Sequence, residues 1–388
     1  MNPLNGLREN LESLKAQGLY RSRRVIDGPQ GVLLQCDGSE LLSFCSNDYL
    51  GLANDPRLAE AMREGTRRYG VGSGAAHLIS GHSAAHHALE EELAGLLGAE
   101  RALLFSTGYM ANVGVLSALL GRGDTLLQDK LNHASLLDGA AQSGARLRRY
   151  RHGDMDGLQR MLDGAEGNCM IASDGVFSMD GDCAPLNEVA MLAAGYDAAL
   201  MVDDAHGFGV LGERGSGSLS AAGLGFDEVP IYMATLGKAL GTAGAFVAGS
   251  EGLIEMLVQR ARSYVYTTAM PAALAEATRA SLRIMAEEEW RRDHLRMLVE
   301  RFRNGAQALG LQLMDSATPI QPVVLGDAQT ALRWSNALLE QGILVTAIRP
   351  PTVPKGSARL RITFSAAHQP GQVDRLLEAL HPLAQEAV

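Results

Sequence analysis

The sequence predicts an α/β protein, with a large domain built on a mostly parallel sheet and a smaller α+β domain near the C-terminus. Between residues ~100 and ~250, short apolar runs alternate with helical patterns, which is typical of a parallel sheet. Several runs are apolar throughout, as expected when helices cover both faces of the sheet. The predicted strands are Ala102–Phe105, Thr125–Gln128, Leu147–Tyr150, Cys169–Ala172, Ala198–Val202, Ile231–Ala234 and Ala245–Ala248.

Length and composition agree with a globular chain of more than one domain. The chain has 388 residues, of which 46% are hydrophobic and 20% are charged. The net charge of −10 argues against general affinity for nucleic acid or for an anionic membrane, so an anionic ligand needs a local basic site. We expect an N-terminal arm and hairpin over residues 1–45, a large domain over 46–285 and a small domain over 286–388.

The cysteines and the N-terminus favour a cytoplasmic protein. Cys36, Cys45, Cys169 and Cys183 form no C-x-x-C pair and have no histidine at metal-ligand spacing, so we expect buried thiols in a reducing compartment and no metal site. The N-terminus lacks the apolar core of a signal peptide. No apolar run approaches the ~18 residues that a transmembrane helix needs.

Before the predicted sheet, the pattern indicates a helix, a hairpin and a glycine-rich loop. Leu4, Leu7, Leu11 and Leu14 share one face of an N-terminal helix. Apolar runs between residues 32 and 44, broken by Asp37-Gly38, predict a hairpin. The glycines of residues 70–77 either bring the backbone close to a ligand or form a flexible turn. Ser83 is then expected to cap a helix with Leu89, Leu93, Leu96 and Leu97 on one face.

After the sheet, residues ~272–309 are strongly helical and are expected to connect the two domains. Glu287-Glu288-Glu289 is most simply a solvated face. In the small domain, Arg359 and Arg361 alternate with apolar residues, which places both arginines on one side of a strand. Val373, Leu376, Leu377 and Leu380 form the apolar face of a last helix.

Polar residues follow the predicted strands, where open α/β sheets bind their ligands. Lys238 comes three residues after Thr235, which ends an apolar run, and small residues surround it. A lysine in such a pocket is desolvated, which lowers its pKa and frees the amine for carbonyl chemistry. Taken alone, it is more simply a surface lysine. The other residues at strand ends are Ser106, Thr107, Gly108, Tyr109, His133, Asp174, Ser178, Asp203 and His206.

Together these residues fit one cofactor, pyridoxal phosphate. The cofactor needs a lysine for its Schiff base, a carboxylate at its ring nitrogen and backbone N–H groups at a helix N-terminus for its phosphate. The alternative is a dinucleotide site, because residues 207–212 match G-x-G-x-x-G after a strand. The glycine-rich segment Glu213–Gly217 that follows cannot open the required helix, so we reject this alternative.

Five segments resemble the α-oxoamine synthases, which are pyridoxal-phosphate enzymes of fold-type I. These enzymes join an amino acid to an acyl thioester with loss of CO2. The resemblance covers about residues 21–368. The segments are Ser46–Gly51, Leu131–Ser135, Gly175–Asp182, Val202–Gly207 and Thr235–Lys238.

The resemblance implies a role for each site residue. Lys238 would carry the cofactor and act as general base, and Asp203 would pair with its ring nitrogen. His133 would stack on the ring, and Ser178 and His206 would bind its hydroxyl. The phosphate would be held by Gly108, Tyr109 and Thr235, and by Thr267 of a neighbouring subunit. The substrate-binding residues implied in the same way are Arg21, Asn47, Thr352 and Arg361.

Within the family, residues 78–82, 108–112, 129–132 and 178–185 are most similar to the member that condenses L-alanine with a pimeloyl thioester in biotin biosynthesis. The resemblance also implies a homodimer with its site at the interface. Glycine-using members, namely 2-amino-3-oxobutyrate ligase and 5-aminolaevulinate synthase, remain alternatives, as does an inactive cofactor-binding homologue. Two departures from the family pattern are Asp174, where glutamate is common, and Ala75-Ala76 in the loop before His77.

Overall fold

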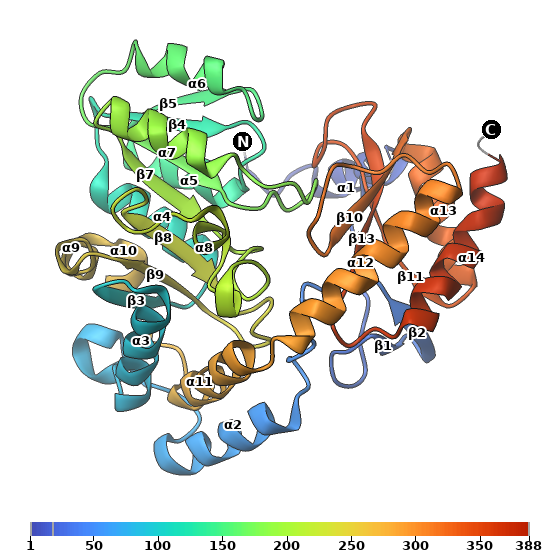
Figure 1. Cartoon of the computed structure of the whole chain (residues 1–388), viewed down its shortest axis with the longest axis horizontal. Coiled ribbons are helices and arrows are strands. Elements are labelled where there is room, and N and C mark those ends of the chain that lie inside the picture. The colour runs from blue at the N-terminus through green and yellow to red at the C-terminus, as the bar shows by residue number, and fades with distance from the viewer. Residues whose placement is uncertain (1, 18, 387–388) are drawn as a thin grey trace.

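A computed structural model describes residues 2–17 and 19–386 and contains a central seven-stranded sheet (Figure 1). The strand order is β3-β9-β8-β7-β6-β4-β5. All neighbours are parallel except β9, which is antiparallel to both β3 and β8. The predicted strands are confirmed to within two residues at each end. Their bounds are β3 (Arg101–Phe105), β4 (Thr125–Asp129), β5 (Arg146–Tyr150), β6 (Cys169–Asp174), β7 (Ala199–Asp203), β8 (Ile231–Thr235) and β9 (Ala245–Gly249).

Helices cover both faces of this sheet, because successive strand residues point to opposite faces. In β3, Leu103 and Phe105 join one apolar cluster, whereas Ala102 and Leu104 join the other. The first cluster includes α4 (Gly108–Leu119), α5 (Ala134–Ser143), α9 (Glu251–Arg260) and α10 (Arg262–Val265). The second includes α3 (Ala84–Leu97), α6 (Met155–Leu162), α7 (Leu186–Gly195) and α8 (Ser218–Ala222). Ser83 caps α3, as predicted.

The C-terminal part contains two three-stranded sheets. One sheet has the order β10-β13-β12, from Ile320–Gly326, Ala358–Thr363 and Thr346–Ile348. The other joins the N-terminal hairpin, β1 (Leu33–Cys36) and β2 (Ser39–Ser43), to β11 (Ile343–Leu344). The hairpin turn is as predicted, since Asp37 and Gly38 have φ angles of 49° and 80°. The pattern did not predict that β2 pairs in parallel with β11.

The helical region after the sheet consists of two helices, where the pattern suggested one connector. α11 (Ala272–Glu287) packs on α2 (Pro56–Tyr69), and α12 (Trp290–Ala308) crosses to the C-terminal part, where α13 (Ala328–Glu340) and α14 (Pro370–Glu386) lie (Figure 1). The division into an arm and two domains remains a prediction.

The N-terminal helix differs in part from the prediction, and the segment after residue 212 agrees with it. α1 (Leu7–Ala16) begins after Gly6, whose φ of 81° breaks the helix, so Leu4 lies outside the predicted apolar face. Residues 207–212 lead only into a short 3-10 helix, η2 (Glu213–Gly215), which agrees with rejecting the dinucleotide site. A π-helix, η1 (His77–Gly81), follows the glycine-rich loop and was not predicted.

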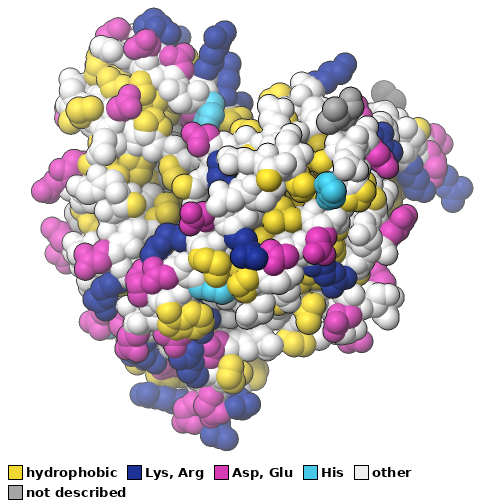
Figure 2. All heavy atoms as spheres, turned by 45° about the vertical axis from the view of Figure 1, so that its right-hand side comes forward, with side chains coloured by type: hydrophobic (Ala, Val, Ile, Leu, Met, Phe, Trp, Pro, Cys, Tyr) yellow, Lys and Arg dark blue, Asp and Glu magenta, His cyan; other side chains and the backbone are white. Residues whose placement is uncertain are grey.

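The distribution of charged side chains on the surface agrees with the net negative charge of the sequence (Figure 2). On the face shown in Figure 2, side chains of both charge signs are interspersed, without a continuous basic area. Across residues 2–17 and 19–386, no helix has the length and apolarity that crossing a bilayer would require.

Candidate active site

The polar residues predicted at the strand ends converge on one cavity of about 190 Å³. It lies beyond the carboxyl ends of β6, β7 and β8, where the topology of an open α/β sheet places ligands. The lining residues are Gly108, Tyr109, Asn112, His133, Ser135, Asp174, Val176, Ser178, Asp203, Ala205, His206, Met233, Thr235 and Lys238. These include all the predicted cofactor-binding residues except Thr267.

Lys238 lies in the loop after β8, and its amine points inward. Its Nζ lies 2.8 Å from Nε2 of His206. Desolvation lowers the pKa of Lys238 to about 8, although the carboxylates of Asp203 and Asp174 act in the opposite direction. A larger share of this amine is therefore neutral near pH 7 than for an exposed lysine. The prediction of a desolvated lysine with a lowered pKa is confirmed.

His206 connects Lys238 to a chain of buried polar groups. Burial lowers the pKa of His206 well below its ordinary value, and the positive charges of Lys238 and Arg361 act in the same direction. The imidazole is thus neutral, and Nε2 accepts a hydrogen bond from the protonated amine. Nδ1 lies 2.6 Å from the hydroxyl of Tyr49, which donates to Oδ1 of Asn47 at 3.2 Å. Nη2 of Arg361 donates to the same oxygen at 3.2 Å.

Asp203 ends β7 and is almost fully buried. Two donors hold its carboxylate: Nδ2 of Asn112 lies 2.7 Å from Oδ2, and the backbone N–H of Ala205 lies 3.0 Å from Oδ1. Asp204, the next residue, points to the other side of the sheet and accepts from the hydroxyl of Tyr232 at 2.7 Å. The paired acids therefore face different environments.

His133 caps the N-terminus of α5. Its Nδ1 accepts from the backbone N–H of Ser135 at 3.3 Å and lies 2.7 Å from that residue's hydroxyl. The backbone N–H of His133 donates to Asp174 at 3.3 Å. Burial raises the pKa of Asp174 well above its ordinary value, and the charge of Asp203 adds to this effect.

The N-terminus of α4 opens into the cavity. Thr107 caps the helix by accepting from the N–H of Met110. The first N–H groups of a helix have no partner within it, so those of Gly108 and Tyr109 are available to an anion. Thr235 lies opposite on β8, and its hydroxyl donates to the carbonyl of Gly244 at 3.0 Å.

Ser178 belongs to a loop that the C-terminal part of the chain holds in place. Nε of Arg361 donates to the carbonyl of Ser178 at 2.6 Å, and the buried Arg359 pairs with Asp180. The hydroxyls of Ser316 and Thr318 both donate to the carbonyl of Gly181. Both arginines of β13 therefore face this loop, as the alternation predicted.

Some predicted residues lie elsewhere. Arg21 and Thr352 line a separate hollow of about 590 Å³, formed by the N-terminal segment and residues 346–352. Asn47 and Arg361 do not line the cavity. Asn47 is connected to it through Tyr49, which contacts His206, and Arg361 is connected through its hydrogen bond to the carbonyl of Ser178. Thr267 follows α10 and does not line the cavity of its own chain.

Sequence reasoning assigned no role to Tyr49, Asn112 or Ser135, although all three lie within the recognised motifs. Tyr49 is fully buried, which raises the pKa of its hydroxyl to about 12. A buried polar residue needs a hydrogen-bond partner, and that requirement was the available signal.

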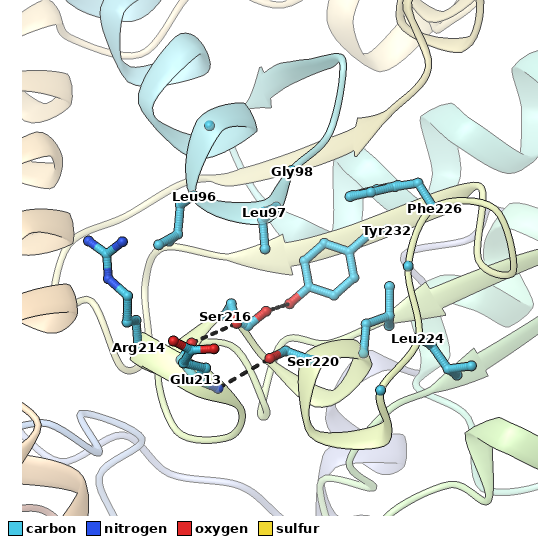
Figure 3. A pocket seen from close by; sticks show the side chains of 14 residues that line it. Leu96, Leu97, Gly98, Glu213, Arg214, Ser216, Ser220, Leu224, Phe226 and Tyr232 are labelled. Atoms are coloured by element: carbon cyan, nitrogen blue, oxygen red, sulfur yellow. Dashed lines mark hydrogen bonds between the residues drawn. The ribbon is translucent and has the colours of Figure 1, made fainter.

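A larger hollow of about 570 Å³ lies between the end of α3 and residues 213–226 (Figure 3). Leu96 and Leu97 form one wall, and the ring of Tyr232 forms another (Figure 3). Its lining contains no lysine or histidine. It therefore lacks the nucleophile and base that the smaller cavity provides.

The comparisons with known proteins agree with this geometry. The family "Aminotransferase class I and II" matches residues 39–380. An 8-amino-7-oxononanoate synthase of Thioalkalivibrio sulfidiphilus is 62% identical over 379 residues, covering 97% of each chain. The synthase of Nitrosococcus oceani is 61% identical and covers 95% of this chain and 98% of its own. The chain belongs to the 8-amino-7-oxononanoate synthases.

Solved structures support the same family and fold. The 8-amino-7-oxononanoate synthase of Francisella tularensis superposes with a TM-score of 0.79 at 32% identity, over 89% of this chain and 97% of its own. Serine palmitoyltransferase of Sphingomonas wittichii gives a TM-score of 0.93 at 30% identity, over 100% and 98%. The serine palmitoyltransferase of S. paucimobilis was solved with pyridoxal phosphate bound. The synthase described here is a fold-type I, pyridoxal-phosphate-dependent acyltransferase.

The residues of the cavity fit this cofactor. It contains a desolvated amine, a carboxylate held by two donors and the N-terminus of a helix, which are the groups that the aldehyde, the ring nitrogen and the phosphate require.

Proposed function

We propose that the chain condenses L-alanine with a pimeloyl thioester, giving 8-amino-7-oxononanoate, CO2 and the free thiol. The observation that supports this proposal best is the hydrogen-bonded pair of Lys238 and the buried His206, which shares one cavity with Asp203 and His133. The names of the relatives support alanine and pimeloyl thioester over the glycine-using alternatives. The intact Lys238 and Asp203 argue against an inactive homologue.

When bound, pyridoxal phosphate supplies an electrophilic aldehyde and a ring that accepts the electron pair released at the α-carbon of the amino acid. Asp203 would pair with the ring nitrogen and keep it protonated. The N–H groups of Gly108 and Tyr109, with the hydroxyl of Thr235, would hold the phosphate. Ser178 and His206 would bind the ring hydroxyl, and His133 would stack on the ring.

Lys238 would hold the cofactor and then take the α-proton of alanine. An amine whose pKa is lowered to about 8 is suited to accept a proton near neutral pH. His206 is neutral in the cavity and hydrogen-bonded to Nζ, so it keeps the amine directed inward between these steps. Loss of CO2 would then require no further base from the protein, because the neighbouring keto group and the bound cofactor would both provide electron acceptors.

Arg361 would bind the carboxylate of alanine. Its Nε is occupied by the carbonyl of Ser178, and Nη2 contacts Asn47, which leaves further N–H groups for the substrate. Arg21 and Thr352 would bind the acyl substrate in their separate hollow.

We also propose a homodimer, as expected of the family. Several large apolar side chains are exposed in the single chain, including Val71, Ile79 and Tyr266. Thr267 follows Tyr266, and in a dimer this segment would reach the phosphate site of the second subunit. None of the four cysteines forms a disulfide in the structure, which supports the proposal of a cytoplasmic location. Only Cys36 is buried and Cys183 is exposed, so the expectation of four buried thiols is wrong.

The substrates are tested by adding L-alanine or glycine to the holoenzyme, followed by pimeloyl-CoA. The visible spectrum of the bound cofactor and the mass of the product are then recorded. We expect L-alanine to change the spectrum and the thioester to yield 8-amino-7-oxononanoate. A response to glycine with no response to L-alanine would move the chain to the glycine-using branch.

Replacing Arg361 by alanine should raise the KM for L-alanine on the order of 10- to 100-fold, because a charged hydrogen-bonding group to the carboxylate is lost. The KM for pimeloyl-CoA should change little. Steady-state kinetics with each substrate varied in turn measures both constants. If only the KM for the thioester rose, Arg361 would belong to the acyl substrate.

A further inference from the structure

Asn112 lies in α4, one turn after Gly108, and is fully buried between two residues of the proposed site. Its Nδ2 lies 2.7 Å from Oδ2 of Asp203 and 2.8 Å from Oγ of Ser135. The hydroxyl of Ser135 lies 2.7 Å from Nδ1 of His133. Asn112 and Ser135 therefore form a continuous chain of hydrogen bonds between the carboxylate and the imidazole.

Counting protons along this chain fixes its direction. If the amide of Asn112 were turned over, its oxygen would face the carboxylate of Asp203, and two acceptors would repel each other. Nδ2 therefore faces Asp203 and gives its two hydrogens to Asp203 and to Oγ of Ser135. The amide oxygen of Asn112 has no hydrogen-bond partner among the described residues. The local structure therefore satisfies both hydrogens of Nδ2 and leaves this oxygen unpaired.

Because the hydroxyl of Ser135 accepts from Asn112, its own hydrogen is free to donate to Nδ1 of His133. The backbone N–H of Ser135 also points at Nδ1, at 3.3 Å. Nδ1 is thus an acceptor, and a neutral imidazole must carry its proton on Nε2.

We propose that Asn112 and Ser135 are positioning residues that hold His133 as its Nε2–H tautomer and couple its orientation to that of Asp203. This inference rests on the proposed function. In that reaction, Nε2 of His133 donates a hydrogen bond to the oxygen of the thioester or keto group and does not accept the α-proton. The base is Lys238 alone.

The first test measures the tautomer directly. The holoenzyme is labelled with ¹⁵N-histidine, and the ring signals of His133 are identified by their loss in His133→Asn. We expect a protonated Nε2 and a bare, hydrogen-bonded Nδ1. Ser135→Ala removes the hydroxyl donor and keeps only the longer contact from the backbone N–H at 3.3 Å, so it should shift the Nδ1 signal of His133 and lower the share of the Nε2–H tautomer. Ser143→Ala is the matched control, because its hydroxyl lies on the same helix and bonds only backbone groups, the carbonyl of Ala140 and the N–H of Ala145.

A proton on Nδ1 in the wild type would overturn the proposal, as would unchanged His133 signals in Ser135→Ala. Neither result depends on turnover. A failure of this inference is therefore distinguishable from a failure of the assigned reaction.

The second test is a double-mutant cycle of Asn112→Ala and Ser135→Ala on kcat with saturating substrates. We expect each single variant to lower kcat by about 10- to 100-fold, the size of one hydrogen bond to a charged or polarised group. The double variant should lose little more than the worse single variant, because both act through one chain. Multiplicative losses would contradict the relay. If Asn112→Ala does not fold, the His133 tautomer in Ser135→Ala decides the question alone.

Discussion

Lys238→Ala should abolish turnover while leaving the fold intact. The variant loses both the covalent attachment of the cofactor and the base that takes the α-proton. A positioned base alone contributes on the order of 10²- to 10⁴-fold, so we expect kcat to fall by at least ~10³-fold. Product formation measures the loss, and circular dichroism verifies the fold. Lys130→Ala is the control. Lys130 is an exposed lysine that follows the carboxyl end of β4, at the same edge of the sheet as Lys238.

The pH dependence of cofactor capture provides a second measurement for Lys238. Only the neutral amine attacks the aldehyde, and the pKa of Lys238 is lowered to about 8 in the cofactor-free chain. The rate of capture should therefore fall about tenfold per pH unit below pH 8 and level off above it. Lys238→Ala should lack this dependence. Turnover near the wild-type rate in this variant would exclude Lys238 as the catalytic amine.

The sheet was predictable because its strands are local and strongly patterned. Runs such as Ile231–Ala234 and Ala245–Ala248 are apolar throughout. Such a run indicates either a strand that is covered on both faces or a segment of a buried helix. The glycines and polar residues that flank each run exclude the buried helix. The carboxyl ends of parallel strands meet at one edge of the sheet, so the sequence predicts that Asp203, His206 and Lys238 lie together, and all three line one cavity.

What escaped prediction depends on distant contacts. The pairing of β2 with β11 joins residues 301 positions apart, and neither strand carries a pattern that selects the other. Asn112 and Tyr49 looked like ordinary polar residues within their motifs. Their importance comes from burial beside Asp203 and His206, which only the fold establishes. Arg21 and Thr352 were assigned by resemblance, and the structure places both in a hollow of their own.

Asp180→Ala should destabilise the protein more than any surface substitution. The carboxylate of Asp180 pairs with Arg359, whose side chain is only 4% exposed. Removing the acid leaves a buried guanidinium without its counter-charge, which typically costs about 3–5 kcal/mol. Urea unfolding of the holoenzyme measures this cost. Asp374→Ala is the matched control: its pair with Arg301 is 41% and 45% exposed, so we expect a loss below about 1 kcal/mol.

The double variant Asp180→Ala, Arg359→Met separates the unpaired charge from lost packing. Replacing a buried ion pair by apolar side chains is often nearly neutral, so the double variant should recover most of the free energy of unfolding. A loss for Asp180→Ala no larger than that for Asp374→Ala would show that water reaches Arg359. The pair also holds the loop that carries Ser178, whose carbonyl accepts from Arg361. Asp180→Ala should therefore weaken binding of pyridoxal phosphate as well. Asp374→Ala should not, because Asp374 pairs with Arg301 and does not contact this loop through that pair.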